Sequence, residues 1–134
     1  MKTIKLLSLF AVLILLSCST DDKSDEVLDE YPRISNIKFE AISTPAMYGH
    51  VQVIINNDYD GAGYTPFNMT IAQMEIERRT FLKLDFEDHP YVNEGNTYHY
   101  EVTLKIYENN KVIAEKQFTV TNEEQEDYLE YTFE

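Results

Sequence analysis

Apolar residues recur at every second position through much of the chain after Pro32, and this alternation constrains the fold more than any other feature. The clearest case is 98–106, where Tyr, Val, Leu and Ile alternate with His, Glu, Thr and Lys. Successive side chains of a strand point to opposite faces, so the pattern predicts a strand with one buried face. We expect further strands at 37–41, 51–55, 72–76, 82–86, 112–120 and 129–133.

Turn-forming residues separate these stretches. Asn109-Asn110 tolerates positive φ at both positions and predicts a two-residue hairpin turn. The segment 77–80 predicts a turn or bulge between two strands, because one continuous strand would point Arg78 into the core. Lys116 interrupts the apolar face of 112–120, and an inward-pointing Lys protects an edge strand. About seven short strands and no segment of helical period predict an all-β domain.

The segment 94–102, Glu-Gly-Asn-Thr-Tyr-His-Tyr-Glu-Val, resembles the strand entry of fibronectin type III and related domains. In those families Gly-Thr precedes alternating Tyr and Val, and a Tyr at the position of Tyr98 makes a corner hydrogen bond. The tryptophan and loop prolines of the family are missing, so the resemblance implies the fold alone. We therefore expect a single immunoglobulin-like antiparallel β-sandwich over 32–134. A small transthyretin-like or lipocalin-like barrel is the alternative.

The N-terminus has the features of an export signal. Lys2 and Lys5 precede an apolar run over 6–16 that is too short to span a membrane core of ~30 Å, and the run ends in Leu15-Leu16-Ser17-Cys18. This segment resembles the bacterial lipoprotein signal, which implies that 1–17 is removed and that Cys18 carries lipid. The alternative is an ordinary secretory signal followed by an incidental cysteine.

A polar, acidic segment follows Cys18, and we interpret 18–31 as a lipidated tether. Ser19-Thr20-Asp21-Asp22 resembles the serine-and-acid stretch behind the lipidated Cys of surface-exposed lipoproteins of the Bacteroidota. The resemblance implies an outer-membrane location in which the domain faces the cell exterior. A plain acidic linker, with the domain on the periplasmic face, is the alternative.

The charge of the chain excludes one class of partner. Residues 18–134 contain nine basic and twenty-four acidic residues, a net charge of −15. Binding of nucleic acid needs clustered Lys and Arg, so we expect no nucleic-acid partner and contact with the membrane only through Cys18. Neither Ser35 nor Ser43 lies in a Gly-x-Ser-x-Gly turn, and no two histidines have a metal-ligand spacing. We therefore expect no enzyme and no catalytic residue.

The segment 56–61 carries the strongest hint of a cofactor. Asn56, Asp58 and Asp60 place side-chain oxygens at alternate positions, and Gly61 occupies the sixth position, as at the start of an EF-hand-type calcium loop. The twelfth position is Phe67, where such a loop has Glu. Calcium binding and a plain turn are therefore both open, since Asn, Asp and Gly are ordinary turn formers.

The same segment begins what we expect to be the longest connection of the domain, 56–68, which carries Tyr59, Tyr64 and Phe67. Aromatic side chains on such a loop stack on sugars or anchor a protein partner, or else they pack on their own loop. The sequence thus predicts a lipid-anchored envelope domain with a non-catalytic binding or accessory role, its ligand a glycan, a protein or an ion. The alternatives are a structural subunit joined to an envelope assembly by sheet-edge pairing and, with least support, a small hydrolase.

Overall fold

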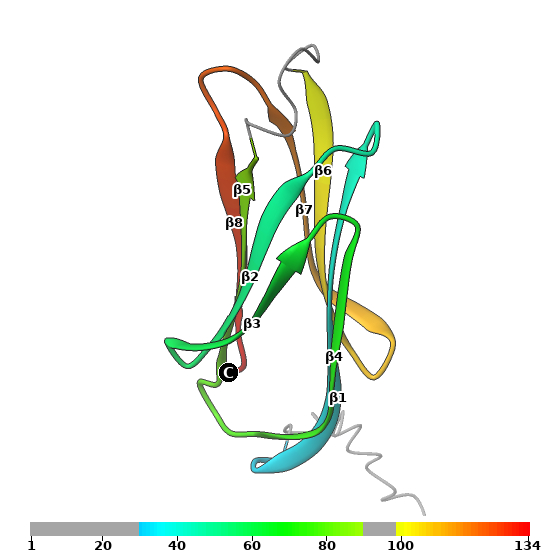
Figure 1. Ribbon diagram of the computed structural model, residues 1–134. Helices are drawn as coiled ribbons and strands as arrows, with labels where there is room; N and C mark the ends of the chain where they lie inside the picture. Colours follow the sequence, from blue (N-terminus) through cyan, green and yellow to red (C-terminus); the bar gives the residue numbers. More distant parts are fainter. Residues whose placement is uncertain (1–29, 90–98) are drawn as a thin grey trace, which may run out of the picture.

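The computed structural model describes residues 30–89 and 99–134, and these form two antiparallel four-stranded sheets packed face to face (Figure 1). The strands are β1 (Arg33–Thr44), β2 (Gly49–Ile55), β3 (Asp58–Tyr64), β4 (Phe67–Ile76), β5 (Phe81–Asp88), β6 (Tyr100–Glu108), β7 (Lys111–Val120) and β8 (Glu126–Thr132). The predicted all-β sandwich is confirmed, with eight strands where about seven were expected.

Several sequence predictions concern residues outside the two described stretches. The export signal, Cys18, nearly all of the tether and the corner residue Tyr98 lie there. Neither described stretch contains a helix that is long and apolar enough to cross a membrane.

The strand order is β4-β1-β6-β7 in one sheet and β3-β2-β5-β8 in the other. The first strand therefore pairs with β4 and β6, whereas the first strand of the constant immunoglobulin domain pairs with the second. Among the eight strands of the described residues, β2–β3 and β6–β7 are hairpins within one sheet, and the other strands that follow each other in sequence lie in different sheets.

The core lies between the sheets, and it is built from the alternating positions. Leu82, Leu84 and Phe86 of β5 face the core, while Lys83 and Asp85 between them face outward. Burying a large apolar side chain contributes about 1.5–3 kcal/mol, so the sandwich is held by its two inner faces. The buried apolar side chains are Ile37, Phe39, Ala41, Val51, Val53, Phe67, Ile76, Leu82, Leu84, Phe86, Tyr100, Val102, Leu104, Ile106, Val120, Leu129 and Phe133.

Both predicted interruptions are present. Asn109 (φ 48°) and Asn110 (φ 67°) form the two-residue turn between β6 and β7. Strands β4 and β5 are separate, and the turn between them is fixed by a 2.9 Å hydrogen bond from the Glu77 N–H to Oγ1 of the buried Thr80.

A backbone irregularity changes which residues of β4 face the core. Gln73 has a φ of 54°, and it forms a bulge in β4 together with Ala72, because these two residues stand opposite the single residue Asn36 of β1. The N–H of Gln73 donates a 2.9 Å hydrogen bond to Oδ1 of Asn36. The N–H of Asn36 donates in turn to Oδ1 of Asn109, at 3.0 Å. Because the strand is interrupted at Gln73, Ala72 is exposed, although its spacing predicted that it shares the inward face of Met74 and Ile76.

The predicted long connection over 56–68 is wrong, because most of it is strand. Asn56 (φ 51°) and Asn57 (φ 70°) form a two-residue hairpin turn, β3 follows at once, and only Thr65 and Pro66 separate β3 from β4. Two residues in the left-handed region match the twist of a hairpin, and Asn tolerates that region.

The glycines of β3 serve the packing between the sheets. A Cβ at Gly63 would lie 2.7 Å from Cδ2 of Phe67, and one at Gly61 would lie 2.8 Å from Sδ of Met69. Side chains at these positions would occupy the space that the first residues of β4 fill. Gly61 thus lies in a strand that packs on Met69 and does not form the bend of a calcium loop.

Candidate functional site

The loop that the calcium hypothesis requires is not formed. Asn56 lies in the hairpin turn, where its Oδ1 accepts a 2.8 Å hydrogen bond from the N–H of Phe81. Asp58 and Asp60 are exposed residues of the edge strand β3. Across 30–89 and 99–134, no three His, Cys, Asp or Glu side chains converge as metal ligands. The three proposed ligands are thus explained as turn and strand residues.

The three aromatic residues predicted to bind a ligand differ in their exposure to solvent. Tyr59 is 66% exposed and Tyr64 is 50% exposed, and both lie on the outer face of the β3-β2-β5-β8 sheet. Phe67 is only 8% exposed and packs in the core. Its assignment as a ligand contact is therefore wrong, because the chain has crossed into the other sheet at Thr65 and Pro66 and Phe67 points inward.

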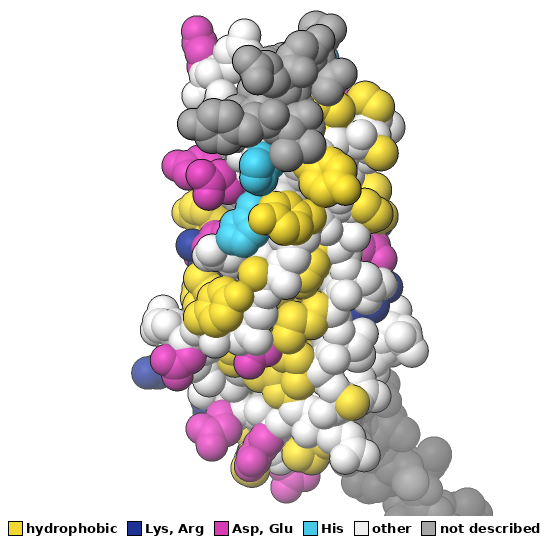
Figure 2. All heavy atoms as spheres, in the orientation of Figure 1, with side chains coloured by type: hydrophobic (Ala, Val, Ile, Leu, Met, Phe, Trp, Pro, Cys, Tyr) yellow, Lys and Arg dark blue, Asp and Glu magenta, His cyan; other side chains and the backbone are white. Residues whose placement is uncertain are grey.

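Tyr64 is the centre of a group of rings, which we call the Tyr64 cluster: the exposed Tyr48 and Tyr64 and the half-buried His50 and His89. The ring centroid of Tyr64 lies 6.2 Å from that of Tyr48, 5.6 Å from that of His50 and 5.9 Å from that of His89. Figure 2 shows histidine side chains beside large apolar ones on this face of the molecule. The cluster draws on the ends of β2, β3 and β5, so it forms only when the sheet is assembled.

Thr65 fixes the position of the Tyr64 cluster. Its N–H donates to the carbonyl of Gly49 at 3.0 Å, and its Oγ1 accepts from the N–H of Gly49 at 3.0 Å. The same hydroxyl donates to the carbonyl of Met47 at 2.5 Å. Thr65 is 5% exposed, so these bonds are shielded from water and hold the corner after β3 against the start of β2.

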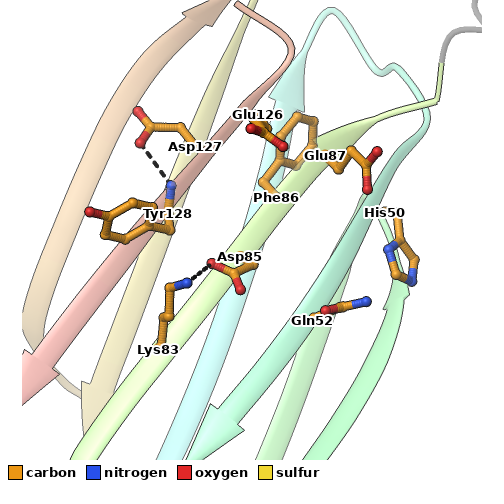
Figure 3. Close-up of a pocket in the computed structure, with 9 residues that line it drawn as sticks. All are labelled: His50, Gln52, Lys83, Asp85, Phe86, Glu87, Glu126, Asp127 and Tyr128. Carbon is orange, nitrogen blue, oxygen red and sulfur yellow. Dashed lines mark hydrogen bonds and ion pairs between the residues drawn. The ribbon is translucent and has the colours of Figure 1, made fainter. Parts of the chain in front are cut away.

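A hollow of about 400 Å³ lies beside the cluster on the same sheet (Figure 3). Its lining residues come from β2, β5 and β8: His50, Gln52, Lys83, Asp85, Phe86, Glu87, Glu126, Asp127 and Tyr128. The strand register places Tyr64, His50, Glu87 and Glu126 in one row across all four strands. The exposed rings and the hollow therefore form one continuous surface, which we call the row face.

Two lysines, Lys83 in the lining of the hollow and Lys116 of the neighbouring β7, are engaged at one end of it. Lys83 lies 2.8 Å from Oδ1 of Asp85, and its Nζ lies 4.6 Å from the ring centroid of Tyr128. Lys116 of β7 lies 2.6 Å from Oδ1 of Asp127 and 5.4 Å from the same ring. Tyr128 is thus held by cation–π contacts, and β7, an edge strand as its Lys116 predicted, is tied to β8 by an ion pair.

The carboxylates at the other end have no partner. Glu87 and Glu126 face each other across β5 and β8. Within the part of the chain that the structure describes, neither side chain makes a hydrogen bond or an ion pair. Like charges directly opposite each other destabilise a sheet. This pair therefore lowers the stability of the fold, and no contact of either carboxylate within the described residues compensates for the repulsion.

Two lysine–glutamate pairs lie on the outer face of the other sheet. Glu40 lies 3.0 Å from Lys38 and accepts a 2.8 Å hydrogen bond from the hydroxyl of Tyr107, and Lys105 lies 3.7 Å from Glu115. Burial raises the pKa of Glu40, but the bonds from Tyr107 and Lys38 outweigh it and leave this pKa below its ordinary value. Burial and the bond to Glu40 raise the pKa of Tyr107 to about 12.

Comparisons with protein-family models, with curated proteins and with solved structures found no match for the chain. The function is therefore argued from the site. Among the residues of the row face, the sequence predicted Tyr64 as a binding residue. It did not predict that role for His50, Glu87 or Glu126. The only indication of these three in the sequence is their outward position in an alternating strand.

Proposed function

We propose that the protein is a non-catalytic binding module of the cell envelope, anchored by lipid at Cys18, and that it docks its ligand on the row face. The observation that carries this proposal is a pair of opposed carboxylates beside exposed rings and a hollow. Glu87 and Glu126 make no hydrogen bond or ion pair within the part of the chain that the structure describes, whereas on the other outer face Glu40 and Glu115 are each paired with a lysine. Residues that lower the stability of a fold without an internal reason are typical of functional sites.

The chemistry of the row face suits binding better than catalysis. Tyr64 and Tyr48 are half exposed and offer apolar area with a polar tip, which is the kind of surface that dominates binding sites. The hollow lies on the outer face of the sheet, and the described residues that line it include no Ser, Thr or Cys that could serve as a nucleophile.

The anchor and tether would give this surface access to partners. The tether over 18–31 separates the sandwich from the lipid by about 20 Å, taking an r.m.s. reach of ~5–6 Å times the square root of its length. A location in the outer membrane with the domain facing outward follows from the resemblance of 15–22 to surface lipoproteins, and the periplasmic face remains the alternative.

The alternative of sheet-edge pairing has less support. Three of the four edge strands of the described sheets carry features that protect edges: Gln73 interrupts β4, a bulge interrupts β3, and Lys116 of β7 is held by Asp127. An incoming strand would have to displace these features.

The anchor is tested by metabolic labelling with a palmitate analogue in a bacterial host. Wild type should incorporate label and Cys18→Ser should not; label on both proteins would refute lipidation at this residue.

The binding surface is tested by surface plasmon resonance against a panel of neutral oligosaccharides and of basic, acidic and neutral peptides. We expect Tyr64→Ala to weaken whichever probe binds by about tenfold, the loss of one buried contact of ~1.4 kcal/mol. Tyr107→Ala removes the same side chain from the other outer face and should leave binding unchanged. Binding that both variants retain, or no binding by wild type, would refute the proposal.

A further inference from the structure

We infer that the ligand of the row face is a basic polypeptide segment, with a Lys or Arg side chain docked between Glu87 and Glu126 and an adjoining side chain against Tyr64. This inference rests on the proposed function and names its partner. We expect a polypeptide as the partner because the row face combines a local excess of negative charge with aromatic rings that can contact a cation.

The charge of the row face is the first argument. The outward positions of β5 and β8 carry four carboxylates, at Asp85, Glu87, Glu126 and Glu130, against the single cation Lys83. Lys83 is already engaged by Asp85 at 2.8 Å, so it does not neutralise the pair of Glu87 and Glu126. Opposed residues of two strands have Cβ atoms about 4.5–5.5 Å apart, a separation at which one guanidinium or ammonium group can contact both carboxylates.

The rings supply the second argument. Tyr128, at the far end of the hollow, already receives Lys83 and Lys116 over its ring, which shows that cation–π contact is favourable on this sheet. No Lys or Arg of the described residues lies over the ring of Tyr64, which is 50% exposed. Tyr64 is therefore open to a side chain of the partner.

The dimensions fit a short extended segment. Tyr64 and Glu126 lie on the two outermost strands of the sheet, three strand spacings apart, or about 14 Å at ~4.8 Å per spacing. An extended chain rises about 3.3 Å per residue, so roughly four to five residues span the row. A segment with a basic residue near one end and an aromatic or basic residue near the other would contact both ends of the row.

The net charge of residues 18–134 acts in the same direction. Their charge of −15 attracts basic partners at long range and speeds their association, and salt screens the attraction. A neutral glycan would hydrogen-bond to the carboxylates but would not neutralise their repulsion, so the unpaired Glu87 and Glu126 favour a cation.

The test uses soluble peptides of about ten residues in which Arg alternates with Thr, the same peptide with Glu in place of Arg, and neutral glucose oligosaccharides. Binding is measured by fluorescence anisotropy of labelled probes at low salt and again at about 0.5 M NaCl. We expect the Arg peptide alone to bind, with an affinity that falls at high salt.

Two double variants carry equal changes of net charge on opposite faces. Glu87→Gln with Glu126→Gln should weaken the Arg peptide about tenfold, at roughly threefold for each exposed pair. Glu101→Gln with Glu115→Gln, on the outer face of the other sheet, should change the affinity by less than about twofold. An equal loss in both double variants would show non-specific attraction to an acidic protein and would overturn the inference.

The other outcomes separate this inference from the proposed function. If an oligosaccharide binds and Tyr64→Ala abolishes that binding, the row face is a binding site but its ligand is not basic, and only the inference fails. If no probe binds to wild type, the inference and the proposed function fail together.

Discussion

Replacement of Gly49 by Ala tests how tightly the start of β2 packs on the core. An ideal Cβ at this position would lie 2.0 Å from Cε2 and 2.3 Å from Cζ of Phe86. Carbon atoms in favourable contact lie about 3.5–4.0 Å apart, so the ring would have to move by more than about 1 Å. Phe86 is 2% exposed and makes an edge contact with Phe118 at a centroid distance of 5.5 Å, so a shift of its ring would disturb the packing of the core.

Gly49→Ala should lower the free energy of unfolding because it adds a methyl group to a core that is already filled. Such changes cost about 1–3 kcal/mol, and we expect Gly49→Ala to lie at the upper end because the obstacle is a rigid ring. With a slope of ~1–3 kcal/mol per molar of urea, the midpoint of unfolding should fall by about 1–2 M. The chain has no Trp, so unfolding is best followed by far-UV circular dichroism.

Gly61→Ala is the matched control. Its Cβ would meet Sδ of Met69 at 2.8 Å, and this atom lies near the end of a flexible side chain that can move aside. We expect a change below about 1 kcal/mol, partly offset by the lower entropy of the unfolded chain. Equal losses in the two variants, or a loss below about 0.5 kcal/mol for Gly49→Ala, would refute the packing argument.

Two further variants test hydrogen bonds made by side-chain hydroxyl groups. Thr65→Val leaves the N–H of Gly49 and the carbonyl of Met47 without their bonds to the hydroxyl, and should cost about 1–3 kcal/mol in urea unfolding; a smaller loss would show that water replaces the hydroxyl. Tyr107→Phe tests the raised pKa of about 12: because the folded state holds this proton more tightly than the unfolded state, wild-type stability should fall as the pH rises from about 10 to 12. The Phe variant should lose less over that interval in pH-dependent unfolding, and parallel curves would contradict the assignment.

The core could be predicted from the sequence because the apolar residues of each buried face recur at every second position of a single strand. Leu82, Leu84 and Phe86 identify β5 without reference to any other segment. The strand β3 has no such pattern: Asp58, Gly61 and Gly63 are residue types that strands disfavour. Its strand structure comes from pairing with β2 and from packing against β4, which are tertiary effects.

The row face could be predicted only in part, for a related reason. Its residues lie on four strands, and they meet through the register between strands, which the spacing within one strand does not contain. Tyr64 was found because an aromatic residue near Asn, Asp and Gly indicates an exposed position. Phe67 has the same neighbours, but the change of sheet at Thr65 and Pro66 turns it inward.

The row face makes one prediction that joins stability to function. If Glu87 and Glu126 are held opposite each other for a ligand, Glu126→Gln should stabilise the free protein while it weakens binding. Cross-strand pairs contribute about 0.2–1 kcal/mol, so we expect a small rise in the urea midpoint at low salt that disappears at high salt. Glu130→Gln is the control on the same strand and face.

Glu130 lies opposite Lys83, so its replacement removes a favourable pairing and should not raise the urea midpoint. Equal stabilisation of both variants would mean that the net charge of the protein, and not the opposed pair, limits its stability. In that case the strongest reason for placing a cation between Glu87 and Glu126 would be lost. The repulsion between these two carboxylates would not measurably destabilise the fold, so a bound cation would have no such repulsion to remove.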